Sequence, residues 1–219
     1  MNHLSCQTYD ELSSKAAELL IQKIKKVTTQ KGKAVIAIPG GKSVAGLLQK
    51  LSPQDVDWSK VDLFMIDERV VPIDDKDSNY KQAYDLFLKR VKSKSHPFFM
   101  EKGFEQYNRE FLGAGAHFDV VIVGVGEDGH IAALFSDHPA LKIKRKKYIR
   151  FDDSPKPPKE RITAAPDVIR DADTVILLFS SAGKKKAYEL FADKNINENE
   201  CPAKIALNAQ EVYVVTEFS

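Results

Sequence analysis

The stretch Ala34-Val35-Ile36-Ala37-Ile38-Pro39-Gly40-Gly41 decides the fold class. Its first five residues form a continuous apolar run, which is typical of a strand buried on both faces, and the Pro-Gly-Gly that follows ends the strand in a turn. Apolar residues then recur at helical spacing over 43–51. A buried strand, a tight turn and a helix in succession indicate an α/β fold, in which helices cover parallel strands.

The same succession recurs outward from this stretch in both directions. Helical patterns cover 12–27, where Asp10 or the pair Ser13 and Ser14 is the expected N-cap, and 80–91. Further strands are expected at 61–66, 120–123, 148–151, 174–179 and 212–216, and a helix from about Lys184. We therefore predict a Rossmann-like α/β fold with a mostly parallel sheet sandwiched by helices. Because a domain usually has roughly 100–200 residues, we expect a single domain over 1–219.

The composition is that of an ordinary soluble globular protein and excludes several classes. Its 33 basic and 31 acidic residues leave a net charge of +2, which argues against a nucleic-acid partner. Two distant cysteines, Cys6 and Cys201, favour a reducing compartment over a disulfide framework. There is no secretory pattern and no apolar run of roughly 20 residues, so we expect no membrane partner and a cytoplasmic location.

Polar and glycine-rich clusters follow four of the predicted strands. They lie at 39–43, 67–69, 124–130 and 180–184. Ligands bind beyond the carboxyl ends of the strands in sheets of this kind, so we expect the four clusters to converge on one site. The Pro-rich segment 152–158 lies within the alternation and is interpreted as an active-site loop or a crossover.

The first cluster has features that suit a phosphate group. Gly40 and Gly41 allow a tight turn that aims backbone N–H groups at a ligand, and a helix N-terminus favours an anion. Ser43 adds a hydroxyl and Lys42 a charge. The spacing is not that of a Walker A loop, and the alternative is a plain strand-to-helix turn.

The second and fourth clusters place cations beside the first. Arg69 carries a guanidinium fork that matches phosphate or carboxylate, although the pattern of 67–69 alone favours a surface ion pair or a helix cap. Asp67 and Glu68 are expected to point to opposite sides, and which of them faces the site is left open. Lys184 begins a helix after a strand and can reach an anionic ligand, whereas the basic run 142–147 is expected to be a solvated face.

The third cluster, Gly124-Val125-Gly126-Glu127-Asp128-Gly129-His130, is the most informative. Histidine is suited to proton transfer near neutral pH, and Asp128 is placed to orient the imidazole of His130. A helix is expected to follow at 131–135, and the alternative is a helix-capping aspartate with a solvent histidine. His3, His96 and His117 are expected at the surface, and no set of residues has convincing metal-ligand spacing.

Several segments resemble those of one known family. They are Gly124–His130 with Ala133-Leu134-Phe135 and Asp137-His138-Pro139, the string Ser154-Pro155-Lys156-Pro157-Pro158-Lys159-Glu160-Arg161-Ile162-Thr163, Pro39-Gly40-Gly41, Asp67-Glu68-Arg69-Val70-Val71-Pro72 and Ser78-Asn79-Tyr80. Together they resemble the 6-phosphogluconolactonases of the glucosamine-6-phosphate isomerase/6-phosphogluconolactonase family. The Asp-Gly-His element is shared with the related glucosamine-6-phosphate deaminases, whereas the string 154–163 is more specific to the lactonases.

The resemblance implies a fold related to sugar-phosphate isomerases and deaminases. It also implies hydrolysis of 6-phospho-D-glucono-1,5-lactone to 6-phospho-D-gluconate in the oxidative pentose phosphate pathway, with no metal or other cofactor. The partner would be a small-molecule sugar-phosphate lactone, and the protein a monomer or weak dimer. An amino-sugar-phosphate deaminase or isomerase and a non-catalytic sugar-phosphate sensor are the alternatives.

The family's roles can be carried over to matching positions. His130 matches the general base and Asp128 lies beside it. The residues expected to bind substrate or its phosphate are Gly40, Gly41, Lys42, Ser43, Asp67, Arg69, Gly126, Arg161 and Lys184. The family's phosphate loop usually reads Ser-Gly-Gly-Ser-Thr-Pro, and this chain departs from it at Pro39 and Lys42 while keeping both glycines.

Overall fold

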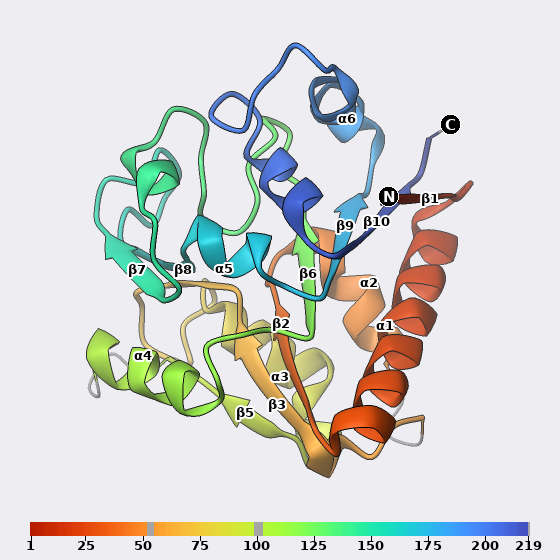
Figure 1. Cartoon of the computed structure of the whole chain (residues 1–219), viewed down its shortest axis with the longest axis vertical. Helices are drawn as coiled ribbons and strands as arrows, with labels where there is room; N and C mark the ends of the chain where they lie inside the picture. The colour runs from red at the N-terminus through yellow and green to blue at the C-terminus, as the bar shows by residue number, and fades with distance from the viewer. Residues whose placement is uncertain (52–54, 99–102, 219) are drawn as a thin grey trace.

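The computed structural model describes residues 1–51, 55–98 and 103–218, and its centre is a seven-stranded parallel sheet (Figure 1). The strands are, in spatial order, β1 (Asn2–Ser5), β10 (Glu211–Thr216), β9 (Thr174–Phe179), β6 (Val120–Gly124), β2 (Ala34–Ile38), β3 (Val61–Met65) and β5 (Lys94–His96). Every neighbouring pair in this order is parallel. The predicted strand at 34–38 therefore lies near the middle of the sheet.

Helices cover both faces of this sheet. One face carries α1 (Tyr9–Lys31), α2 (Lys42–Lys50) and α3 (Asn79–Leu86), and the other carries α4 (Phe104–Gly113), α5 (Pro166–Arg170) and α6 (Lys185–Ala192). Along β2, Ile36 and Ile38 pack into the first layer while Val35 and Ala37 pack into the second. This two-sided burial explains the unbroken apolar run of the strand and confirms the predicted α/β fold.

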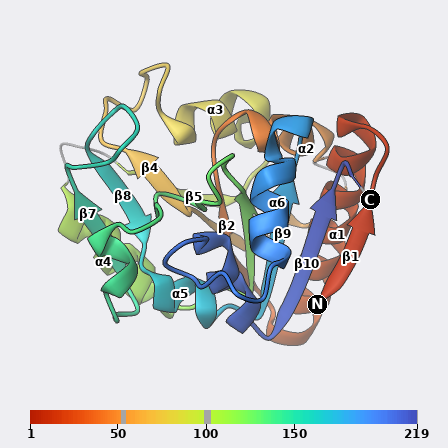
Figure 2. The same cartoon turned by 90° about the horizontal axis from the view of Figure 1, so that it is seen from above.

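A smaller antiparallel sheet lies to one side of the main sheet. Its order is β4 (Asp67–Arg69), β8 (Arg161–Ala164) and β7 (Tyr148–Phe151), and Figure 2 shows it on the side of the molecule opposite β1. Ile66 joins the two sheets, because its N–H donates to Ile38 O in the main sheet and its carbonyl accepts from Ala164 N in the small one, both at 2.9 Å. Residues 67–69, expected as a polar cluster directly after a strand, therefore form a strand of their own.

Several local expectations are wrong. The helix expected at 131–135 is absent, because Ile131 instead forms isolated bridges with Val125 and Leu134. The N-cap of α1 is Thr8, whose hydroxyl accepts from Glu11 N at 3.1 Å, rather than Asp10, Ser13 or Ser14. The helix expected over 80–91 ends at Leu86, and Leu88–Arg90 form a 3₁₀ turn.

Short elements complete the fold. Further 3₁₀ segments are Trp58–Lys60, Pro139–Lys142, Ala182–Lys184 and Pro202–Asn208. Over 1–51, 55–98 and 103–218, no helix combines the length and the apolar character needed to cross a bilayer.

Candidate active site

The four predicted clusters meet in one cavity at the carboxyl ends of the strands. Its volume is about 630 Å³. The predicted residues that line it are Gly40, Gly41, Lys42, Ser43, Asp67, Arg69, Gly126, His130, Arg161 and Lys184. Asp128 is the one predicted site residue outside the lining, and it contacts the cavity through His130.

His130 and Asp128 form an acid–base pair. The imidazole Nδ1 makes a short hydrogen bond to Asp128 Oδ1, and Lys156 Nζ lies 2.9 Å from Asp128 Oδ2. Burial raises the pKa of Asp128, but the hydrogen bonds from His130 and Lys156 lower it more, so this pKa lies well below its usual range. An ionised Asp128 that accepts the Nδ1 proton leaves the lone pair on Nε2, and Nε2 is therefore the nitrogen able to take up a proton.

Gly126 is the residue that makes room for this imidazole. Its N–H donates to His130 O at 2.8 Å and its carbonyl accepts from Gly129 N at 3.0 Å, so the loop folds back on itself. A Cβ at Gly126 would lie 2.0 Å from the His130 ring. Glycine is required here because any side chain would displace the imidazole.

A second part of the cavity is suited to an anion. Lys184 Nζ donates to Ser43 Oγ at 2.5 Å, and the lysine is 9% exposed. Burial lowers the pKa of Lys184, and the nearby carboxylate of Glu127 opposes that shift. Ser43 also lies in the first turn of α2, where backbone N–H groups have no intrahelical partner. A buried cation and a helix N-terminus thus face the same space.

The glycine turn itself is held from outside. Gly41, with φ +93°, precedes α2, and its N–H donates to Gln82 Oε1 at 2.6 Å. This N–H is therefore engaged within the protein, and the groups left for a ligand are those of the next residues, Lys42 and Ser43. Gly40 has no space for a side chain, because a Cβ there would lie 2.1 Å from Asn79 Oδ1.

The Asp67-Glu68-Arg69 strand divides its side chains between the cavity and helix α3. Asp67 and Arg69 line the cavity. Glu68 instead points to the start of α3, where Oε1 accepts from Asn79 N at 2.7 Å and Oε2 accepts from Tyr80 N at 2.8 Å. Asp67 is therefore the carboxylate that faces the cavity, which answers the question left open by the sequence. Burial raises the pKa of Asp67, and the nearby positive charges of Arg69 and Arg161 oppose that shift.

Arg69 is held rigidly at the cavity wall. Its NH1 donates to Asp77 O at 3.0 Å and to the side-chain oxygen of Asn79. Its Nε is buried and has no hydrogen-bond partner among the described residues. Asn79, quoted in the sequence analysis only within the segment Ser78-Asn79-Tyr80, is thus a site residue that holds Arg69 at the cavity.

Lys156 is the principal site residue that sequence reasoning missed. It lines the cavity together with Pro157, and its Nζ lies 3.2 Å from His130 Nδ1 as well as against Asp128. Arg161 holds this loop, because Nε donates to Pro158 O at 2.9 Å and NH2 to Pro157 O at 3.0 Å. The loop at 152–158 therefore reaches the site, and its signal in the sequence was the string 154–163.

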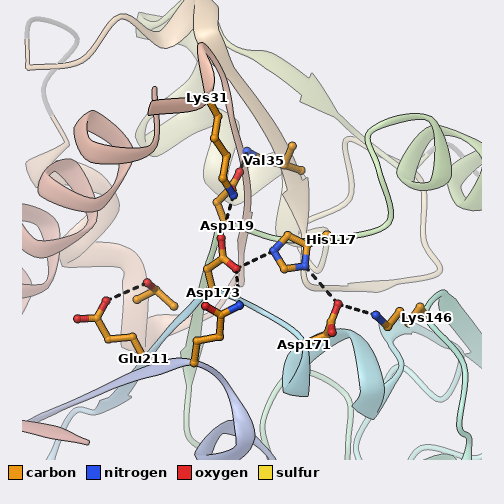
Figure 3. Close-up of polar contacts among 10 residues, drawn as sticks. Lys31, Val35, His117, Asp119, Lys146, Asp171, Asp173 and Glu211 are labelled. Atoms are coloured by element: carbon orange, nitrogen blue, oxygen red, sulfur yellow. Dashed lines mark hydrogen bonds and ion pairs between the residues drawn. The ribbon is translucent and has the colours of Figure 1, made fainter. Parts of the chain in front are cut away.

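Another polar cluster lies at the amino-terminal ends of the strands, opposite the cavity (Figure 3). Lys31 Nζ contacts Asp119 at 2.5 Å and Asp173 at 3.0 Å, and Asp119 also accepts from Val35 N at 2.7 Å. The His117 ring lies between Asp173, at 3.0 Å, and Asp171, at 3.2 Å. His117, Asp119 and Asp173 bring together metal-type ligand atoms despite their unremarkable sequence spacing. Because Lys31 already forms ion pairs with both aspartates, we interpret the cluster as an ion-pair network.

Two of the histidines expected at the surface are more enclosed than predicted. His117 is half-buried in that network. His96 is buried, with Nδ1 at 3.0 Å from Glu110 Oε2 and its ring stacked on Phe64 at 4.1 Å between centroids. Both are held by neighbours that come together only in the folded chain.

Comparison with solved structures defines the class of fold. A 6-phosphogluconolactonase from Shewanella baltica superposes with a TM-score of 0.87 at 23% identity, covering 99% of this chain and 97% of the other. A monomeric glucosamine-6-phosphate deaminase of the NagB superfamily superposes with a TM-score of 0.80 at 23% identity, covering 99% and 97%. This chain therefore has the same fold as both of these proteins, and the fold alone does not separate the two activities that their names give.

Sequence comparison then defines the family. The family model described as glucosamine-6-phosphate isomerases/6-phosphogluconolactonase matches residues 7–215 of this chain. A 6-phosphogluconolactonase of Borreliella burgdorferi is 34% identical over 195 residues, covering 84% of this chain and 83% of its own. One of Mycobacterium tuberculosis is 36% identical over 198 residues, covering 81% and 80%. The chain belongs to the family of glucosamine-6-phosphate isomerases and 6-phosphogluconolactonases.

Proposed function

We propose that this protein is a 6-phosphogluconolactonase, which hydrolyses 6-phospho-D-glucono-1,5-lactone to 6-phospho-D-gluconate. The observation that carries the proposal is one cavity with two parts: the His130–Asp128 pair, and the anion-binding surface of Lys184, Ser43 and the start of α2. A phosphorylated lactone requires both a base and a phosphate site. The names of the bacterial relatives at 34–36% identity support the same assignment.

The chemical step follows from the hydrogen bonding of the imidazole. Nε2 of neutral His130 removes a proton from water as the water oxygen attacks C1 of the lactone. The imidazolium then returns that proton to the ring oxygen as its bond to C1 breaks, which yields the open-chain acid. Asp128 holds the tautomer and stabilises the transient imidazolium, and a positioned base of this kind contributes roughly 10²–10⁴-fold to the rate.

The remaining residues bind and orient the substrate. Lys184, Ser43 and the N–H groups of the first turn of α2 receive the phosphate, and Arg69 adds its fork from the neighbouring wall. Asp67 faces the same cavity as a buried acceptor. In this proposal Arg161 acts indirectly, because its donors hold the loop that carries Lys156.

The decisive experiment measures acid release from freshly prepared lactone, corrected for spontaneous hydrolysis. His130→Gln should lower kcat by roughly 10²–10⁴-fold with KM within a few-fold of wild type, because binding groups remain while the base is lost. A His130→Gln variant with most of the wild-type kcat would remove His130 from the mechanism. A wild-type protein without lactonase activity would refute the assignment.

Glucosamine-6-phosphate deaminase activity is the alternative that one observation favours, since the solved deaminase has the same fold. Release of ammonia from glucosamine 6-phosphate would identify it. Against it stands the string 154–163, which places Lys156 on the Asp128–His130 pair. A sensor without catalysis would instead be stabilised by sugar phosphates without turning them over.

We also propose that residues 1–219 act as one domain, as a monomer or weak dimer, in the cytoplasm. Sedimentation at several concentrations tests the oligomeric state. Several plant relatives are described as chloroplastic, so the cytoplasmic location is tested by imaging a tagged protein.

A further inference from the structure

Tyr9, the first residue of α1, makes a contact that the proposed mechanism does not use. Its hydroxyl donates to Lys42 O at 2.8 Å and accepts from Gly46 N at 2.9 Å. These are the carbonyl and N–H that are paired four residues apart in an α-helix. The hydroxyl therefore bridges the first turn of α2, and the ring of Tyr9 also lines the cavity.

The approach of α1 to this turn depends on Gly46. A Cβ at Gly46 would lie 2.9 Å from Tyr9 Cε1 and 2.4 Å from Ser13 Oγ. An ion pair between Asp10 and Lys50, at 2.7 Å, joins the same two helices further along. Because α1 begins at Tyr9 and α2 begins at Lys42, the Tyr9 contacts fix the start of α1 against the first turn of α2, and the Asp10–Lys50 pair ties the start of α1 to the end of α2.

The turn held by Tyr9 is the turn that faces the anion-binding part of the cavity. No side chain caps α2 at Gly41 within the described residues, so its first N–H groups are oriented by contacts from outside the helix. Gln82 holds the backbone of Gly41 on one side, and Tyr9 holds Lys42 and Gly46 on the other. Lys184 adds a contact to the Ser43 hydroxyl, but Tyr9 is the side chain that holds the backbone of Lys42 and Gly46, so its loss would release the backbone of this turn on one side.

We propose that Tyr9 is a positioning residue for the phosphate subsite, acting by fixing the first turn of α2 rather than by touching the reacting atoms. This inference rests on the proposed function for the identity of the phosphorylated ligand. It predicts an effect on binding of the phosphate group that is separate from any effect on the chemical step.

Tyr9→Phe keeps the aromatic ring and removes both hydrogen bonds. We expect KM for the lactone and Kd for 6-phosphogluconate to rise together by about three- to tenfold, with kcat within about twofold of wild type. Calorimetric binding of gluconate, which has no phosphate, should not change. Tyr84→Phe is the matched control, because Tyr84 is exposed and does not line the cavity, and it should behave as wild type.

Other results would overturn the proposal. An unchanged Kd for 6-phosphogluconate in folded Tyr9→Phe would show that the bridge has no bearing on phosphate binding. Equal weakening of gluconate and 6-phosphogluconate, or a fall in kcat alone, would assign Tyr9 another role. If wild type proved to be a deaminase, the lactonase assignment would fail, and the same comparison with glucosamine 6-phosphate against glucosamine would still decide the role of Tyr9.

Discussion

Asp128 holds two partners, His130 and Lys156, on one carboxylate. Oδ1 accepts from His130 Nδ1 and Oδ2 contacts Lys156, so an amide at this position would present its NH₂ group to one of two donors. Asp128→Asn should therefore favour the wrong imidazole tautomer and lower kcat by roughly 10²–10⁴-fold, with little change in KM. Steady-state lactonase kinetics measure this, and a variant with wild-type kcat would contradict the role given to Asp128.

Lys184 should make the binding of a phosphorylated ligand weaken at alkaline pH. Burial lowers the pKa of this lysine, so it loses its charge at a lower pH than an exposed lysine does. The protonated form binds phosphate, and affinity for 6-phosphogluconate should therefore fall as pH rises through the lowered pKa. Calorimetry across pH tests this, with Lys184→Met as the control that binds weakly throughout and lacks this alkaline decline.

At the scale of elements, Glu68 connects strand β4 to helix α3. Its carboxylate accepts from the backbone N–H groups of Arg69, Asn79 and Tyr80. Glu68→Gln replaces one acceptor oxygen by a donor, which leaves at least one buried N–H unpaired and should reduce the free energy of unfolding by about 1–3 kcal/mol. Because Arg69 and Asn79 lie at the cavity, KM should rise too. Urea denaturation with wild-type stability would show that α3 does not need this cap.

The elements that were predictable from sequence are those with a strong local signal. The strands at 34–38 and 174–179 are continuous apolar runs, and the structure buries both fully. Strand β8 was missed because Arg161-Ile162-Thr163-Ala164 is short and has polar residues that are buried only by the neighbouring strands. The prediction of a helix at 131–135 was wrong because Ile131 and Leu134 are buried in a bridged turn. That turn presents apolar residues at the same spacing as a helix does.

The candidate site was predictable to a similar extent. Strand ends converge by topology, so residues such as Ser43 and Lys184 could be placed together from their positions alone. Segment 152–158 was predicted as an active-site loop or a crossover, but the contact of Lys156 with Asp128 was not predicted. That contact depends on Arg161 holding the carbonyls of a loop far along the chain from His130. Long-range hydrogen bonds of this kind leave no periodic trace in the sequence.

For the whole molecule, the ion-pair network around Asp119 and the candidate active site lie at opposite ends of the strands. Asp119 joins β2 to the end of α1 through Val35 N and Lys31, far from the carboxyl ends of the strands (Figure 3). Asp119→Ala leaves the buried N–H of Val35 without its acceptor and should cost about 1–3 kcal/mol of unfolding free energy. The folded variant should keep wild-type kcat/KM. Denaturation and kinetics on one preparation measure both, and a large loss of kcat/KM would show that the two ends are coupled.

Ile66 couples the unfolding of the two sheets. One residue supplies the N–H for a bond to Ile38 in the main sheet and the carbonyl for a bond from Ala164 in the small sheet. Neither sheet can lose its pairing at this point without disturbing the other, and the hydrophobic residues behind both belong to one cluster. We therefore expect the small sheet to unfold together with the main one in a single cooperative transition, so that the cavity wall it provides persists for as long as the core does.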